Sequence, residues 1–469
     1  MNDALDKPGP YRLPERVQRP TAQVLESRTP ASGRTVSLVL GLIYTIMFRQ
    51  VYWSYISLEW GYTGLIYRDL GFFELTFIYC SVAVVSWFVP VRIDRPSSVI
   101  IWFLYAIVYV PTMSITMMIG TLPARVYVPE LVALSIGMII ICRTAAYVQK
   151  EAGPQEAQPG VMFVRLVLAA FLSVSIFIFF YFRDIMSFAS IDDVYVQRFV
   201  AADMTGGVTG YIRAYYGSLI LPMMIGMGIC NRSRWGLAVL GALGFVMSYM
   251  VDASKVSLVI PLIMVISGIA FRYQGLRVYH LTAGLTIVCL ISAALTSSTR
   301  LVRFVADLVL LRTISIPAQT FAQYFDVFYQ KGYTWWSNVT GLNLVLPVPA
   351  AFRSDQFWPV LGQIVGAEYY GFASRVNLNA NPFVGEGVAA AGWIGVIVIS
   401  VAISVFLYAL DRLSAGWDRL LVLVLMVPIG LTLTNVHLST FLVSFGGLAW
   451  LVLFRFYKPS RSAEAGAMA

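Results

Sequence analysis

Charged side chains are scarce in this chain. They make up 12% of its 469 residues, whereas 58% of the residues are hydrophobic. A soluble protein carries about 25% charged residues, so the composition excludes a soluble globular fold. Apolar runs of about 20 residues recur, and each is long enough to cross a hydrocarbon core of about 30 Å. The sequence therefore predicts an all-α, polytopic integral membrane protein.

Histidine and cysteine are also rare, which limits the ligands for any metal site. The chain has two histidines, His280 and His437, and four cysteines, all within apolar runs. The cysteines, at positions 80, 142, 230 and 289, have neither metal-binding spacing nor the pattern of a disulfide framework, and they are predicted to be small core residues. No HExxH, GxGxxG or Walker pattern occurs. We therefore expect no metal, no cofactor and no nucleic-acid partner.

The predicted organisation is a set of membrane spans around one large loop. Twelve spans are predicted, at 36–56, 72–90, 98–120, 127–147, 161–182, 211–230, 235–251, 255–271, 279–297, 386–409, 419–434 and 436–455. The last two are nearly continuous, so eleven spans are an alternative. The domains are then a tail over 1–34, nine spans over 35–297, a loop over 298–385, three spans over 386–456 and a second tail over 457–469. The first tail is polar and rich in Pro and Arg, which predicts a disordered cytoplasmic segment and not a cleaved signal peptide.

The distribution of Lys and Arg predicts that both termini are cytoplasmic. Every loop on the side of the N-terminus holds at least two cations, whereas the short loops on the other side hold Arg125, Lys255 or none. The long loop over 298–385 is then external. A structureless loop of that length is unusual, so it is expected to fold back onto the membrane, with an interfacial amphipathic helix over 303–321.

The external segments also carry cations that the orientation rule does not explain. These are Arg183, Arg198, Arg213, Lys255, Arg300, Arg303, Arg312, Lys331, Arg353 and Arg375. An external cavity that receives an anionic substrate would need such side chains. The positions of the cations therefore favour a binding site on the external side.

Three external stretches have two interpretations each. In YMVDASKVSLVIPL (249–262), Asp252 and Lys255 either pair with each other, or Lys255 begins a helix and points at a phosphate. In 310–332, Arg312, Gln319, Gln323 and Asp326 recur at about helical spacing, which suits either a surface helix or a binding segment kinked at Pro317. In 192–217, Arg198 and Arg213 flank a Gly-rich turn, which is either a solvated loop or a hinge.

Two residues suit acid–base chemistry. In NPFVGEGVAAAGWIGVIV (381–398), Glu386 stands between glycines at the external mouth of an apolar run. Those glycines are expected to let a sugar approach the backbone closely. His437 lies at the external junction of the last two predicted spans, either as a structural hydrogen-bonding residue or as a functional one.

Three of these stretches together resemble bacterial oligosaccharide repeat-unit polymerases, the O-antigen polymerase (Wzy-type) family. They are NPFVGEGVAAAGWIGVIV, DASKVSLVIPLI (252–263) and RTISIPAQTFAQYFDVFYQKG (312–332). The resemblance implies a GT-C-like fold and metal-independent polymerisation of undecaprenyl-diphosphate-linked repeat units at the periplasmic face of the inner membrane. The product would be O-antigen, capsule or exopolysaccharide. The related O-antigen ligases use a periplasmic-loop histidine, and the segment 298–385 contains none.

The resemblance also implies roles for individual residues. Lys255 and Arg312 would face the diphosphate, which as a good leaving group needs charge stabilisation more than protonation. Glu386 is the motif carboxylate, and Glu386 or His437 would activate the acceptor hydroxyl. Further candidates for substrate binding are Arg198, Arg213, Arg375, Tyr324 and Asp326. The implied partners are two lipid-linked oligosaccharides, donor and acceptor, together with the bilayer and a chain-length regulator protein. Some family members carry an Arg-x10-Gly pattern, and Arg198 and Arg375 lack that spacing.

Three other functions stay open. An O-antigen ligase or another lipid-linked glycosyltransferase would use the same kind of donor. A transporter of lipid or polysaccharide would place charges near mid-membrane and would contain broken helices. A metal-dependent glycosyltransferase would bind its ion through Asp192 and Asp193, or through Glu59 and Asp69 in the first external loop.

Overall fold

The computed structural model describes residues 30–147, 157–188, 194–273, 275–295, 299–373, 376–457 and 459. Over these ranges the chain is helical and contains no β-strand. Eight helical stretches are long and apolar enough to cross a membrane, and four shorter apolar helices accompany them. The architecture is that of an all-α, multi-pass membrane protein.

The eight long stretches are Ala31–Thr63, Pro96–Ile119, Ala124–Thr144, Val161–Phe182, Val208–Cys230, Arg232–Asp252, Val278–Leu295 and Gly385–Leu413. The four shorter helices are Phe72–Phe88, Lys255–Phe271, Arg419–Leu433 and Gly447–Phe456. Each of the twelve predicted spans overlaps one of these stretches. How many of them cross the membrane stays a prediction.

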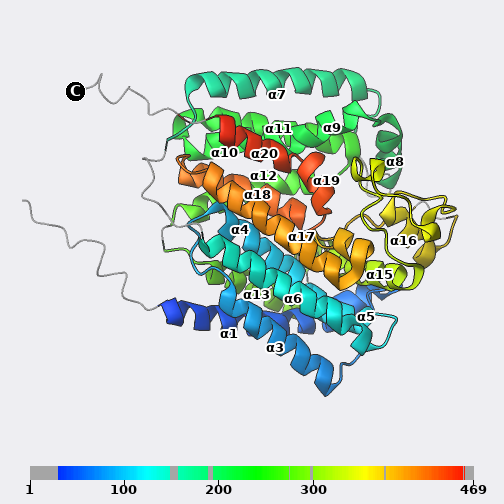
Figure 1. Ribbon diagram of the computed structural model, residues 1–469. Helices are drawn as coiled ribbons and strands as arrows, with labels where there is room; N and C mark the ends of the chain where they lie inside the picture. The colour runs from blue at the N-terminus through cyan, green and yellow to red at the C-terminus, as the bar shows by residue number, and fades with distance from the viewer. Residues whose placement is uncertain are drawn as a thin grey trace, which may run out of the picture.

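The helices that matter for the site are named as in Figure 1. They are α1 (Pro30–Val51), α3 (Phe72–Phe88), α5 (Val110–Ile119), α6 (Ala124–Tyr147), α7 (Val161–Phe182), α8 (Val194–Met204), α9 (Val208–Tyr215), α10 (Leu221–Cys230), α11 (Trp235–Asp252), α12 (Lys255–Phe271), α13 (Val278–Leu295), α14 (Arg300–Ala306), α15 (Ile316–Lys331), α16 (Leu361–Tyr370), α17 (Gly385–Leu413), α18 (Arg419–Leu433), α19 (Leu438–Val443) and α20 (Gly447–Phe456).

The bundle has a central layer that two outer groups of helices cover. In the centre, α17 packs along α6, and α18 packs against α12. One outer group holds α1 with α3 and α13, and the other holds α10, α11 and, at the edge of the bundle, α7 (Figure 1). α1 begins and α20 ends at one end of the bundle, whereas α15 and α16 lie at the opposite end, which we call the loop end (Figure 1).

Several helices contain a wide π-helical turn, and proline explains three of them. The π-helical segments Leu104–Tyr109, Tyr216–Ile220 and Asp307–Ser315 each end two residues before a proline, at Pro111, Pro222 and Pro317. Proline has no N–H for the helical hydrogen-bond ladder and crowds the preceding turn. The ladder therefore widens just ahead of each ring, as is common at helix irregularities.

The expected interfacial helix over 303–321 is not one surface helix. α14 is largely exposed, a π-helical segment follows it, and α15 is then buried from Pro317 to Phe328. Because α15 packs against α5 and α17 as well as α16, both its polar and its apolar side chains are enclosed. The prediction of a surface position for this segment was wrong for α15, whose helical spacing looks amphipathic in the sequence.

The last predicted span, 436–455, is interrupted. It consists of α19 and α20, separated at Ser444–Gly446, where Gly446 has a φ of 75°. A left-handed backbone of this kind ends a helix and favours glycine. The first tail is partly helical, since α1 begins at Pro30, and residues 1–29 lie outside the described ranges.

Candidate functional site

A buried polar cluster lies near the loop end, where α15, α17 and the α18–α19 connection meet. Its members are Tyr324, Asn381, Glu386 and His437. Tyr324 and Asn381 are fully buried, and Glu386 is 1% exposed. The Tyr324 and His437 rings meet edge to face, with centroids 5.6 Å apart. The structure therefore brings together three of the predicted site residues, namely Glu386, His437 and Tyr324.

The Glu386 carboxylate is held by Ser439, through both the backbone and the side chain of that residue. Its Oε2 accepts the backbone N–H of Ser439 at 3.1 Å. The Glu386 Oε1 and the His437 Nε2 are buried without a hydrogen-bond partner among the described residues, whereas the Asn381 amide interacts with the Tyr324 hydroxyl. Orphaned buried polar atoms cost about 1–3 kcal/mol each, so a native fold usually keeps them for a purpose. The cluster can accept hydrogen bonds and protons from a ligand.

His437 and Tyr324 stay neutral in this environment. His437 lies in the α18–α19 connection, outside the apolar helices, and burial lowers its pKa to about 4. Burial also raises the pKa of Tyr324 well above its ordinary value, and the nearby Glu386 carboxylate acts in the same direction. A neutral imidazole can accept a proton, whereas the Tyr324 hydroxyl already donates its hydrogen to the carbonyl oxygen of Leu378 at 3.1 Å.

The glycines beside Glu386 serve packing inside the protein, which corrects the expectation that they admit a sugar. A Cβ on Gly385 would meet the Asn381 amide, and a Cβ on Gly387 would meet the backbone of Gly395. The space that each missing side chain leaves is therefore already filled. The first turn of α17 lies directly against its own later turn.

α17 is folded back on itself by a break at Ala391 and Gly392. Gly392 has φ 57° and ψ −137°, a conformation that side chains other than glycine rarely adopt. The break frees the carbonyl groups of Ala389 and Ala390. They accept hydrogen bonds of 2.9 Å and 3.0 Å from the backbone N–H groups of Thr334 and Trp335 in the large loop.

Glu130 supports the same break, and sequence reasoning missed it. It is 4% exposed on α6, its carboxylate interacts with the backbone N–H of Trp393, and its Oε2 has no hydrogen-bond partner among the described residues. A carboxylate here offsets the partial positive charge where the second part of α17 starts. The available signal was a lone acidic residue inside an otherwise apolar run.

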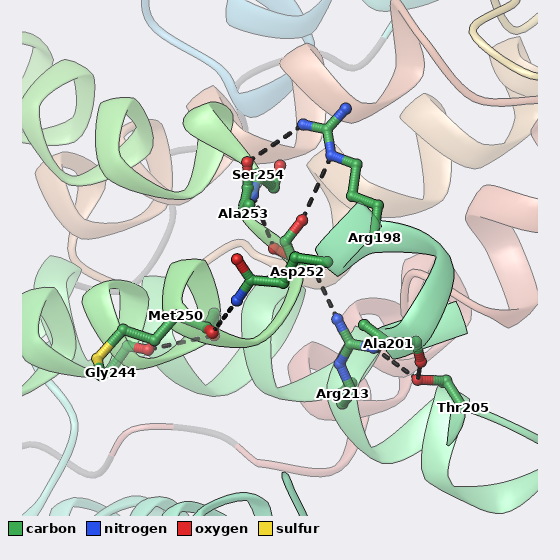
Figure 2. A network of polar contacts seen from close by, with 11 residues as sticks. Arg198, Ala201, Thr205, Arg213, Gly244, Met250, Asp252, Ala253 and Ser254 are labelled. Carbon is green, nitrogen blue, oxygen red and sulfur yellow. Dashed lines mark hydrogen bonds and ion pairs between the residues drawn. The ribbon is translucent and has the colours of Figure 1, made fainter. Parts of the chain in front are cut away.

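A second polar group lies where α8 and α9 meet the end of α11 (Figure 2). Arg213 forms an ion pair with Asp252, with Nη2 and Oδ2 3.0 Å apart, and it donates to Thr205 Oγ1 at 2.7 Å. Arg198 donates to the backbone carbonyls of Asp252 and Ala253, each at 3.3 Å. Cations suit this position because the C-terminal end of a helix carries partial negative charge. Two of the predicted cations thus meet at one turn.

Asp252 pairs with Arg213 and not with Lys255. The staple between Asp252 and Lys255, one of the two interpretations of this turn, is therefore not formed. Lys255 is exposed at the start of α12. Arg312 is exposed on the π-helical segment before α15, away from this turn. Arg375 and the pair Asp192 and Asp193 lie outside the described ranges.

Arg213 and Asp252 line a cavity of about 420 Å³, which we call the Arg213 cavity. Its walls are mainly apolar and come from α9, α11, α12, α18 and the residues that follow α18. They include Phe245, Ile260 and Phe441. An apolar cavity with a guanidinium at its lining suits an amphiphilic anion.

The Arg213 cavity and the buried polar cluster share one stretch of backbone. Asn435 and Val436, in the α18–α19 connection, line the cavity. The next residue, His437, faces Tyr324 in the cluster. Glu386, His437, Lys255 and Arg312 do not line the cavity. The same connection therefore lines the cavity through Asn435 and Val436 and contacts the cluster through His437 and, just after it, Ser439.

A smaller pocket of about 220 Å³ lies on the other side of α15, and we call it the Asp326 pocket. It is lined by Tyr62, Thr63, Gly64, Ile119, Ala322, Gln323, Asp326, Tyr369 and Tyr370. Asp326, one of the predicted substrate-binding residues, therefore lines a pocket. Over the described ranges, no group of three or more His, Cys, Asp and Glu side chains is arranged to hold a metal ion.

No protein-family model, no curated protein and no solved structure matches this chain.

Proposed function

We propose that this protein is a membrane glycosyltransferase that polymerises undecaprenyl-diphosphate-linked oligosaccharide repeat units. The observation that carries the proposal is that one stretch of chain, residues 435–439, both lines the Arg213 cavity and contacts the cluster of Glu386 and Tyr324. The cavity suits the lipid diphosphate of a donor. The cluster suits activation of an acceptor hydroxyl. The product would be O-antigen, capsule or exopolysaccharide.

The donor site would be the Arg213 cavity. Its apolar walls suit isoprenoid chain, and Arg213 with the neighbouring Arg198 suits a diphosphate. A bound diphosphate would share the guanidinium of Arg213 with Asp252. As the glycosidic bond breaks, the anomeric C–O electron pair leaves with the diphosphate, and preorganised cations stabilise that charge without protonating it.

The acceptor would be activated by Glu386 or His437. A general base must lie within hydrogen-bond reach of the hydroxyl that it deprotonates. The Oε1 of Glu386 has no hydrogen-bond partner among the described residues, while Ser439 fixes the other oxygen. The acceptor oxygen forms the new bond to the anomeric carbon, and its proton passes to Glu386 or His437. The connection at Asn435 and Val436 must move aside for the donor to reach this cluster.

The proposed orientation puts the loop end outside the cytoplasm. It rests on the distribution of cations, which favours twelve spans with both termini inside. In a bacterium the loop end would then face the periplasm from the inner membrane. A GT-C-like arrangement and a chain-length regulator as partner belong to the same proposal.

A transporter is a second candidate, and the break in α17 favours it. Many secondary transporters build their substrate sites from discontinuous helices. Here α17 is broken at Gly392, and a second interruption separates α19 from α20. A transporter site at the membrane midplane would require a break near the middle of the helix. The break in α17 lies close to its start at Gly385, which argues against a transporter.

The decisive experiment uses the purified full-length protein in lipid nanodiscs. The substrate is the lipid-linked repeat unit that accumulates in a deletion strain of the source organism. We expect a ladder of polymer on a gel. Glu386→Gln should slow its formation by about 100-fold or more, whereas Glu59→Gln, an exposed carboxylate on the same side, should have no effect.

Two outcomes would overturn the proposal. One is wild-type activity in both the Glu386→Gln and the His437→Gln proteins, which would exclude both candidate bases. The other is no polymer in nanodiscs together with movement of the same lipid across the membrane of sealed vesicles, which would establish the transporter.

A further inference from the structure

We propose that the Asp326 pocket is a binding site for one neutral sugar ring of the acceptor oligosaccharide. The role in polymerisation rests on the proposed function, but sugar binding itself does not. Binding and polymerisation can therefore be tested separately.

The size of the pocket restricts its occupant. Pockets for drug-sized ligands measure about 300–1,000 Å³. At about 220 Å³, this one suits a single small ring. Tyr62, Tyr369 and Tyr370 contribute to its lining. Aromatic rings present large, rigid contact surfaces with a polar tip, which is the form that packs against the C–H face of a sugar.

Asp326 organises the pocket through hydrogen bonds. It is 4% exposed, and its Oδ2 accepts from Thr121 N at 3.2 Å, Thr121 Oγ1 at 2.9 Å and the Tyr369 hydroxyl at 3.0 Å. Its Oδ1 accepts from the hydroxyl of Tyr127. The two oxygens of a carboxylate offer about four lone-pair sites, so this carboxylate is saturated by neutral donors. It is therefore poorly suited to bind a cation.

The same bonds leave oriented acceptors at the wall of the pocket. Tyr369 gives its hydroxyl hydrogen to Asp326, so its oxygen can accept. Tyr370 donates to the carbonyl oxygen of Thr63 at 3.4 Å. Gln323 adds an amide that bonds to the Tyr370 hydroxyl and, having two donors and an acceptor, keeps further capacity for a ligand. Among the described residues, no Lys or Arg lines the pocket. Such a wall complements the hydroxyl groups of a neutral sugar rather than a phosphate.

The rim of the pocket is fixed to the protein core. The Thr63 carbonyl accepts from Gln319 Nε2 at 2.7 Å, which ties the rim to α15. Gly64 has a φ of 93° and turns the chain at this point. The site is thus built on rigid elements, which suits a preorganised binding pocket.

The pocket is one helix away from the buried polar cluster. Gln323 and Asp326 of α15 line the pocket, whereas Tyr324 points to His437. Successive residues of an α-helix diverge by about 100°, so one helix serves both sites. A sugar in the pocket would therefore be a unit of the acceptor chain next to, but not at, the reacting hydroxyl. The pocket would act as a specificity subsite.

The test measures binding of free sugars without any donor lipid. Saturation-transfer NMR is recorded on the nanodisc-embedded protein with millimolar methyl glycosides of glucose, galactose and N-acetylglucosamine. At least one glycoside should give a signal that Tyr62→Ala abolishes, and Gln323→Met should weaken the affinity about tenfold. Tyr62 is 80% exposed, so its replacement leaves the fold intact, and Tyr273→Ala, at 70% exposure outside the pocket, is the matched control.

The outcomes separate the two proposals. If no glycoside gives a signal that depends on Tyr62, the pocket is not a sugar site, whatever the protein polymerises. If sugars bind through Tyr62 and the protein makes no polymer, the sugar site stands and the proposed function fails. If polymer forms and Tyr62→Ala leaves the KM for the acceptor unchanged, the role as an acceptor subsite is wrong.

Discussion

The backbones of Gly387 and Gly395 lie in direct contact across the break in α17, eight positions apart in the chain. A Cβ on either glycine would collide with the other residue's carbonyl group. This contact holds the first turn of α17, with Glu386, against the rest of the helix. It explains why a carboxylate at the mouth of a membrane segment is flanked by glycines.

Gly395→Ala should therefore destabilise the protein by about 1–3 kcal/mol, the usual cost of overpacking. Alanine favours a helix over glycine by about 1 kcal/mol, so the helical propensity acts in the opposite direction. Thermal unfolding in detergent measures the effect. Gly284→Ala in α13 is the control, because nothing lies within 4 Å of a Cβ there, and it should leave the protein unchanged or more stable. If Gly395→Ala and Gly284→Ala changed the stability equally, the contact between Gly387 and Gly395 would not be important for the fold.

Arg213→Ala should lower the stability by about 1–3 kcal/mol, because it leaves the partly buried Asp252 carboxylate without its cation. Adding Asp252→Asn to this variant should recover part of the loss. Arg183→Ala, on an arginine whose side chain is 61% exposed, is the control and should have little effect. Chemical denaturation of these three variants, and of Asp252→Asn alone to complete the double-mutant cycle, checks this. Strictly additive effects at 213 and 252 would show that the ion pair contributes nothing.

His437 should make the protein sensitive to acid. Its pKa of about 4 in the folded protein lies below the value of 6.5 for an ordinary histidine. The unfolded chain therefore takes up this proton first, and the free energy of unfolding falls as the pH drops from 6.5 towards 4, by at most about 3 kcal/mol. Above pH 6.5 the effect is absent.

His437→Gln should remove this part of the pH dependence, as measured by Tm between pH 4 and pH 7.5. His280→Gln, on the exposed histidine of α13, should retain the wild-type slope. If His437→Gln and the wild type lose the same Tm on acidification, His437 does not carry the effect.

Glu130→Gln should be tolerated better than Glu130→Leu. Glutamine keeps an oxygen that can accept from the N–H of Trp393, whereas leucine leaves that N–H without this partner. An unpaired backbone N–H in an apolar helix bundle costs about 1–3 kcal/mol, so Leu should be the less stable variant by that amount. Thermal unfolding of both variants in the same nanodiscs compares them. A leucine variant as stable as the glutamine variant would mean that Glu130 does not support the break.

The helices were predictable because their signal is local. Runs such as 161–182 are apolar apart from Arg165 and two serines, and the predicted bounds coincide with α7 at Val161–Phe182. α15 was not predictable as a buried helix, because its sequence carries polar side chains at helical spacing. Those side chains bond to other parts of the chain, as Gln319 does to Thr63 and Asp326 to Thr121. Such partners are set by tertiary packing and leave no mark on the segment itself.

Part of the candidate site was predictable because it, too, has a local signal in the sequence. Glu386 and His437 stood out as ionisable groups in apolar surroundings, and the structure places both around Tyr324. The partner of Asp252 could not be inferred, since Lys255 is close in sequence while Arg213 is close in space. Glu130 went unnoticed because its partner, the N–H of Trp393, exists only where α17 breaks.

The hydrogen bonds from Thr334 and Trp335 to Ala389 and Ala390 make the segment just after α15 a structural part of α17. Grafting a foreign loop at residue 332 would strip two carbonyls of their donors and loosen the helical turn that carries Glu386. A chimera that retains residues 333–336 and is spliced further along, in the exposed stretch 341–345, would spare that turn. Natural variation in loop length is therefore expected to accumulate after the two tryptophans, Trp335 and Trp336, and not before them.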